Sequence, residues 1–202
     1  LEFRRVLFRS LERLAREVPP GVLLVVDEAY HEYGRHAGGP DVLAALAARR
    51  GPWIVLRTFS KAHGLAALRV GYALCGSDVE AEALRRAKTT FNVTEMAQAA
   101  ALASLGDEAH LAATLDANAR ERAHLEDGFR RLQLRTYPSA TNFVSVDLGV
   151  PAQPAMQALA ARGIHVRDWR HPDWTTQLRV AIGTREDNDA VLAALEIGRA
   201  HV

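Results

Sequence analysis

The chain has 202 residues, of which 49% are hydrophobic and 24% charged, and its formal net charge is +1. This is the composition of an ordinary globular protein, and so small a net charge gives no reason to expect a nucleic acid or a membrane as partner. The single cysteine, Cys75, excludes an internal disulfide and suits a cytoplasmic location. The eight histidines lack metal-ligand spacing, so we expect no metal site.

Both ends of the chain look foreign to the rest. A DNA segment that would encode residues 7–10 has a reverse complement that would encode residues 197–199, as if one inverted element had been read through at each end. We therefore interpret residues 1–10 and 197–202 as non-native flanks. The alternative is a native basic segment and a frayed helix. On the first interpretation the native protein is longer and its beginning is missing.

In the first half of the chain, strands alternate with helices. The pattern predicts a helix at 11–18, a strand buried on both faces at 22–26, a loop at 33–40, a helix at 41–50, strands at 53–56 and 70–75, and helices at 78–88 and 94–105. The last helix is almost free of polar residues and is expected to be buried. This order is typical of an α/β fold with a mainly parallel sheet.

The second half begins with one long amphipathic helix, at 107–132. Strands are then predicted at 142–148, 164–167 and 177–182, with helices at 154–162 and up to residue 195. Gly163 is suited to a left-handed helix cap, and Thr184 begins a capping box. The chain therefore divides into part of a large domain (11–105) and a connecting helix with a smaller C-terminal α+β domain (106–196).

Polar residues cluster at the ends of the predicted strands in the first domain. Asp27 ends the first strand, Ser60 and Lys61 follow the second, and Arg69 comes just before the third. Ligands of open α/β sheets gather outside the carboxyl ends of the strands, so these side chains are expected to converge. Together with Tyr30 they are the residue types that pyridoxal phosphate requires: an amine, an acid, a phenol, and donors for a phosphate.

Several segments resemble one family. Residues 25–30 (VVDEAY) and 57–72 (RTFSKAHGLAALRVGY) look like the class I/II aminotransferases, which are pyridoxal-phosphate enzymes of fold type I, and most like the histidinol-phosphate aminotransferases. The resemblance continues in FNV at 91–93, AQAAAL at 97–102, SATNFV at 139–144, GIHVR at 163–167 and LRVAIGT at 178–184. It covers residues 11–195.

The resemblance implies a role for each residue of the first cluster. Asp27 pairs with the pyridine nitrogen of pyridoxal 5'-phosphate, and Tyr30 bonds its phenolic oxygen. Lys61 holds the cofactor as a Schiff base and moves protons, while Ser60 and Arg69 hold the phosphate.

In the second domain the resemblance implies substrate contacts. Arg179 and Arg167 bind the acidic group of the substrate, and Asn142 lies near it. The implied activity is transamination of histidinol phosphate with 2-oxoglutarate in histidine biosynthesis, by a cytoplasmic homodimer that acts on small molecules.

Two positions depart from the subfamily: His63 stands where an aromatic is usual, and Ala67 where glycine is usual. Neither removes a reacting group, although alanine constrains a turn that glycine would relax.

Taken singly, each residue has a simpler interpretation. Asp27 is compatible with a cap, Lys61 with a solvated surface lysine, Arg69 with a surface ion pair and Tyr30 with the core. Arg167 is compatible with an ion pair to a nearby aspartate, either Asp168 or Asp173.

Alternative functions also remain open. They are an aromatic aminotransferase, a threonine-phosphate decarboxylase, and a domain that lacks the cofactor and serves only for interaction. The 202-residue chain is itself expected to be an inactive fragment.

Overall fold

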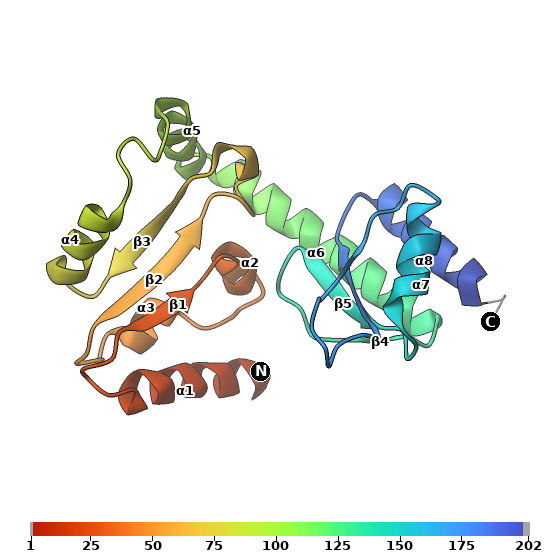
Figure 1. Cartoon of the computed structure of the whole chain (residues 1–202), viewed down its shortest axis with the longest axis horizontal. Coiled ribbons are helices and arrows are strands. Elements are labelled where there is room, and N and C mark those ends of the chain that lie inside the picture. The colour runs from red at the N-terminus through yellow and green to blue at the C-terminus, as the bar shows by residue number, and fades with distance from the viewer. Residues whose placement is uncertain (1, 200–202) are drawn as a thin grey trace. The chain divides into compact units, whose positions relative to one another are not determined.

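The computed structural model describes the backbone of residues 2–199 and the side chains of residues 10–196. Residue 1 and residues 200–202, which belong to the two predicted flanks, lie outside it. The chain divides into two compact units, Leu1–Leu115 and Asp116–Val202. The division falls inside the long helix α6 (Glu108–Arg131). Each unit has its own sheet, and the two are described separately (Figure 1).

The first unit is built on a three-stranded sheet of order β1-β2-β3. Its strands are β1 (Leu24–Asp27), β2 (Trp53–Thr58) and β3 (Gly71–Cys75). Strand β1 is parallel to β2, whereas β3 is antiparallel to β2. Of the two pairings in this sheet, one is therefore parallel, so the expected mainly parallel sheet holds only for β1 and β2.

Helices α1 (Glu2–Glu17) and α3 (Val42–Leu46) pack on one face of this sheet, as Figure 1 shows. Their shared core contains Ala15, Leu46 and the fully buried Val55. Helix α1 begins nine residues before the predicted start at residue 11. Pairs such as Arg13 and Glu17, one turn apart, favour helix, because oppositely charged side chains at this spacing attract one another.

Three predictions for this unit are wrong. Strand β1 is not buried on both faces, since its exposure alternates and Val25 is 50% exposed. Residues 33–36 of the loop predicted at 33–40 belong to helix α2 (His31–His36). Helix α5 (Glu95–Leu105) buries only Ala97 and Ala101 and leaves Met96 and Leu102 each 74% exposed. An apolar composition indicates that a strand or helix has a surface to bury. Within the first unit, however, β1 and α5 are each covered on one side only.

Two further helices complete the first unit. Helix α4 (Asp78–Ala87) is capped by Ser77, whose hydroxyl accepts a hydrogen bond from the amide of Val79. A short 3-10 helix, η1 (Ala66–Leu68), leads into Arg69.

The second unit is a four-stranded antiparallel sheet of order β4-β5-β7-β6. Its strands are β4 (Arg135–Thr136), β5 (Phe143–Asp147), β6 (Arg167–Asp168) and β7 (Gln177–Ala181). Helices α7 (Ala152–Ala160) and α8 (Arg185–Arg199), with the end of α6, pack on one face. The core there includes Phe129, Val144, Leu178 and Val180, each at most 1% exposed. The predicted α+β unit is thereby present.

The predicted helix ends of this unit are also present. Gly163 has a φ of +77°, the left-handed geometry expected after α7. At the start of α8, the Thr184 hydroxyl accepts from the Asp187 amide at 3.2 Å, and the Asp187 carboxylate accepts from the Thr184 amide at 3.0 Å. This is a reciprocal capping box.

Helices α6 and α8 are joined by a charged contact. Arg185 donates to both oxygens of Glu121 at 2.9 Å, and Asn188 donates to the same carboxylate at 3.1 Å. The hydrogen bonds from Arg185 outweigh burial and, with that from Asn188, lower the pKa of Glu121 to about 2.

Within the described part of the chain, no helix is long and apolar enough to cross a membrane.

Candidate functional site

One edge of the first sheet carries the predicted cofactor residues. Strands β1 and β2 run in the same direction, with Asp27 opposite Leu56, so both strands end at this edge. Ser60 and Lys61 follow the end of β2 directly. Arg69 reaches the same edge because β3 is antiparallel to β2, which places the start of β3 beside the end of β2. A parallel third strand would have put Arg69 at the opposite edge.

The loop that carries Lys61 is tightly closed. The Phe59 amide donates to the Val70 carbonyl at 3.2 Å, and the Leu65 amide donates back to the Phe59 carbonyl at 2.9 Å. The turn is completed at Gly64, whose φ of +72° is one that glycine adopts without strain. Phe59 itself is buried. The loop therefore holds Lys61 in a defined position.

Lys61 lies over an aromatic ring. Its Nζ is 5.3 Å from the centre of the Tyr30 ring, a distance at which a ring face attracts a cation. The chain contains one other lysine, Lys88, which is exposed at the end of α4. Lys61 is thus the half-buried lysine of the chain, and the predicted phenol lies beside it.

Ser60 and Arg69 form a pair suited to an anion. The Arg69 Nη1 lies 3.5 Å from the Ser60 Oγ and donates to the Ala66 carbonyl at 2.8 Å. Arg69 has a φ of +54°, an unusual backbone conformation for a residue with a side chain. Such conformations persist where the surroundings enforce them, often at functional sites. A guanidinium beside a hydroxyl matches the oxygens of a phosphate.

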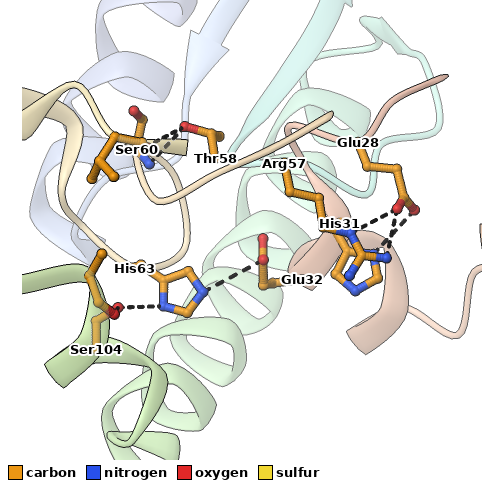
Figure 2. Close-up of polar contacts among 10 residues, drawn as sticks. Glu28, His31, Glu32, Arg57, Thr58, Ser60, His63 and Ser104 are labelled. Atoms are coloured by element: carbon orange, nitrogen blue, oxygen red, sulfur yellow. Dashed lines mark hydrogen bonds and ion pairs between the residues drawn. The ribbon is translucent and has the colours of Figure 1, made fainter. Parts of the chain in front are cut away.

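An ion pair joins Glu28, which follows β1, to Arg57 of β2, and Figure 2 shows it together with His31. Arg57 contacts one carboxylate oxygen of Glu28 through Nε at 2.9 Å and Nη2 at 2.8 Å. The other oxygen lies 3.1 Å from His31 Nδ1. Burial raises the pKa of Glu28, but the hydrogen bonds of His31 and Arg57 outweigh it and the pKa is lowered. Glu28 stands between Asp27 and Tyr30 in sequence, and the ion pair connects this segment to β2.

His63 is held from two sides, also in Figure 2. Its Nδ1 lies 3.1 Å from Ser104 Oγ and its Nε2 lies 3.6 Å from a Glu32 oxygen, with the His63 and Glu32 side chains only 8% and 10% exposed. Its ring centre is 5.0 Å from that of Phe59. His63 therefore ties the Lys61 loop to α2 and α5.

The second unit carries the predicted substrate residues on one sheet. Arg167 of β6 and Arg179 of β7 are direct cross-strand partners, so their side chains leave the same face. Like charges placed opposite each other destabilise a sheet. Among the residues with described side chains, neither arginine has a carboxylate within 4.0 Å; Asp168 pairs with Arg170 instead. This face therefore carries two guanidinium groups without a carboxylate partner among the described side chains.

Asn142 lies just before β5, three residues along the chain from Ser145, the cross-strand partner of Arg179. Its carbonyl accepts a hydrogen bond from the Ile182 amide at 2.9 Å, which extends the pairing of β5 with β7. The position is set by the neighbouring Thr141, whose carbonyl accepts from the Asn118 side chain at 3.1 Å.

The sequence did not single out Glu28, Arg57, Thr58 or Ser104 as contributors to the site. The Thr58 hydroxyl accepts from the Ser60 amide at 3.1 Å and so shapes the start of the Lys61 loop. The one available signal was an arginine and a threonine in a strand that is otherwise apolar. Among the described residues, no group of three or more histidine, cysteine or acidic side chains could hold a metal.

The family model that matches this chain and the relatives similar to it point to the same family. The family model "Aminotransferase class I and II" matches residues 9–195. Histidinol-phosphate aminotransferase 2 of Methylococcus capsulatus is 48% identical over 179 residues, covering 89% of this chain and 48% of that protein. The enzyme of the same name from Pseudomonas aeruginosa is 47% identical over 192 residues, covering 95% and 52%. The chain therefore spans about half the length of the curated relatives it matches.

A solved structure agrees. Histidinol-phosphate aminotransferase from Sinorhizobium meliloti, in complex with pyridoxal-5'-phosphate, superposes with a TM-score of 0.85 at 31% identity, covering 96% of this chain and 53% of that one. The likeness confirms the predicted fold class, the α/β fold of the fold type I transferases. By its motifs, its fold and the match over residues 9–195, the chain belongs to the class I and II aminotransferase family.

Proposed function

We propose that the protein to which this chain belongs is a pyridoxal-phosphate-dependent aminotransferase that converts histidinol phosphate and 2-oxoglutarate into imidazole-acetol phosphate and glutamate. One observation carries the proposal: Lys61 lies in a closed loop at the sheet edge that also presents Asp27 and Arg69. The names of the relatives support the choice of reaction.

The side chains at the edge fit the cofactor by their chemistry. Ser60 and Arg69, 3.5 Å apart, supply a hydroxyl and a guanidinium for the phosphate. Asp27 follows β1 at the same edge and would keep the pyridine nitrogen protonated. Tyr30, beside Lys61, would bond the phenolic oxygen. The bound cofactor would supply an electron sink, which weakens a bond at the substrate's α carbon.

Lys61 then has two tasks. Its amine would hold the cofactor covalently until a substrate amine replaces it. The released Nζ would take the proton from the substrate's α carbon, acting as a general base. Both tasks need a lysine that stays in place, and the backbone hydrogen bonds that close the loop around Lys61 support this role.

Arg167 and Arg179 would bind the anionic end of the substrate. Histidinol phosphate offers a dianion, which two guanidinium groups suit better than one. Glutamate offers a carboxylate to the same pair in the other half-reaction. The cross-strand register of the two arginines, without a carboxylate partner among the described side chains, supports this role. Asn142, just before β5, would lie near the substrate.

The test is a transamination assay of the full-length protein. Histidinol phosphate with 2-oxoglutarate is expected to be the preferred pair, with phenylalanine and threonine phosphate run beside it. Lys61→Ala should abolish turnover, and Lys88→Ala, the matched control, should retain it. Better use of phenylalanine would point to an aromatic aminotransferase and contradict the substrate assignment. Release of carbon dioxide from threonine phosphate would point to a decarboxylase.

An interaction domain without cofactor is the alternative from another class. It predicts that the full-length protein binds no pyridoxal phosphate and that Lys61 and Asp27 can be replaced without effect. The intact set of Asp27, Tyr30, Lys61 and Arg69 favours the enzyme. We also propose that the enzyme is cytoplasmic and forms a homodimer. Size-exclusion chromatography with light scattering would test the homodimer.

A further inference from the structure

The outer face of the second sheet carries a cluster of aromatic rings around Arg179. The guanidinium carbon of Arg179 lies 5.0 Å from the centre of the Phe143 ring and 5.8 Å from that of Trp169. The two rings are themselves 5.8 Å apart, edge to face at 68°. The three groups thus form a near-equilateral triangle in which Arg179 contacts two ring systems.

Trp169 is fixed independently of Arg179. Its indole Nε1 donates to the Ser145 Oγ at 2.8 Å, and Ser145 is only 7% exposed. Ser145 and Arg179 are direct cross-strand partners in β5 and β7, so the indole spans the same face. On its other side Trp169 meets the edge of Trp174 at 5.6 Å. The indole ring of Trp169 is therefore held in place beside Arg179, whose side chain is exposed.

This arrangement solves a physical problem of the arginine pair. Arg179 faces Arg167 across the strands, and repulsion between the two guanidinium groups would turn Arg179 away before an anion arrives. The electron-rich faces of two aromatic rings attract the cation and offset that repulsion. An arginine held in this way has already lost the rotational freedom that binding an anion would otherwise cost.

We propose that Trp169 is a positioning residue that preorganises Arg179 for the anionic group of the substrate. The inference rests on the proposed function, because it assumes that Arg179 binds that group. The proposed role of Trp169 restricts the substrates to molecules with a carboxylate or phosphate that can bind the preorganised guanidinium of Arg179. Because the effect is on binding, it appears in KM and not in kcat.

The experiment uses the full-length protein loaded with pyridoxal phosphate, so that the cofactor's own phosphate site is filled. The probe is glutarate, which has the two carboxylates of glutamate but no amino group and cannot react. Calorimetric titration should show that Trp169→Leu raises the Kd for glutarate about tenfold. In the transamination assay the same variant should raise KM about tenfold and leave kcat within twofold.

Two further variants separate positioning from folding. Trp174→Leu, the matched control, removes a ring that contacts Trp169 but not Arg179, and should change the Kd less than threefold. Ser145→Ala removes the hydrogen bond that orients the indole, and should raise the Kd about threefold even if Trp169→Leu does not fold. Thermal unfolding of each variant provides the measure of its structural effect.

The outcomes are distinct. A Trp169→Leu or Ser145→Ala protein that binds glutarate as tightly as the unaltered one overturns the role of Trp169 alone. Equal weakening by Trp174→Leu overturns it as well, because the effect then comes from the cluster as packing. Failure of the unaltered protein to bind glutarate overturns the proposed substrate site itself.

Discussion

Replacing Arg57 with methionine tests how the catalytic edge is held together. The change keeps most of the apolar volume but leaves the Glu28 carboxylate without the two contacts it now receives at 2.8 and 2.9 Å. Removing one partner of a buried ion pair costs about 3–5 kcal/mol, because the other charge stays buried. Glu28 and Arg57 side chains are 9% and 11% exposed, and His31 remains as a partner, so we expect about 3 kcal/mol.

The assay is thermal unfolding of the full-length protein. Since the relatives are about twice as long as this chain and the entropy of unfolding grows with length, a loss of about 3 kcal/mol corresponds to a fall in Tm of about 4 °C. Arg86→Met is the matched control. It breaks the Arg86–Glu82 pair, also at 2.9 Å but with side chains 80% and 48% exposed. Exposed pairs contribute about 0–1 kcal/mol, so its Tm should fall by no more than about 1 °C.

The pH dependence gives a second check. In the unaltered protein the pKa of Glu28 is lowered, so its stabilisation is complete above its ordinary value of 4.5 and is lost as the pH falls through the lowered pKa. Without Arg57, the lowering that its hydrogen bond and charge provide is lost, so the pKa of Glu28 is higher in Arg57→Met than in the unaltered protein. The carboxyl of the variant therefore takes up a proton before that of the unaltered protein as the pH falls, and the penalty of Arg57→Met should be smaller at pH 5 than at pH 8. Equal Tm losses in both variants, or a penalty that grows as the pH falls, would refute this reasoning.

Three other predictions follow from the same geometry. Asp27→Asn should keep the cofactor's visible absorbance while turnover falls by orders of magnitude, because an unprotonated pyridine is a poor electron sink; near-normal turnover would contradict the pairing. Arg179→Lys should lower kcat/KM for both substrates about tenfold, or about 1.4 kcal/mol, while Arg167→Ala should impair histidinol phosphate more than glutamate; steady-state kinetics with each substrate would show either. Because the pKa of Glu121 is lowered to about 2, its stabilisation is present above about 4.5 and lost between there and about 2, so Glu121→Gln should unfold more easily at pH 6 and no more easily near pH 2. A stability difference that stays constant over this range would argue against the Arg185 contact.

Local sequence patterns were sufficient for most of the elements. The helical spacing of apolar residues, together with capping residues, predicted the long helices. Gly163 and Thr184 predicted helix ends that the structure has. Motifs at strand ends predicted that Asp27 and Lys61 share one edge, whereas Arg69 reaches that edge only because β3 is antiparallel to β2. These features depend on neighbours within a few residues, which is the range over which sequence patterns are informative.

Features that depend on distant partners were not predicted. The apolar residues of β3 would suit a parallel or an antiparallel strand equally well. The antiparallel direction of β3 depends instead on the connection through Arg69. The ion pair of Glu28 with Arg57 joins residues 29 positions apart. Helix α5 was expected to be buried from its composition, yet burial depends on what packs against it, and Leu102 stays 74% exposed in this unit.

The central claim is that Lys61 is the lysine that binds pyridoxal phosphate. The direct measurement is to load the full-length protein with the cofactor, reduce it with borohydride so that the attachment becomes permanent, and identify the modified peptide by mass spectrometry. The account predicts the cofactor on Lys61, and no labelling at that site in Lys61→Ala. A cofactor found on Lys88, on a lysine outside this chain, or on no lysine at all would contradict it.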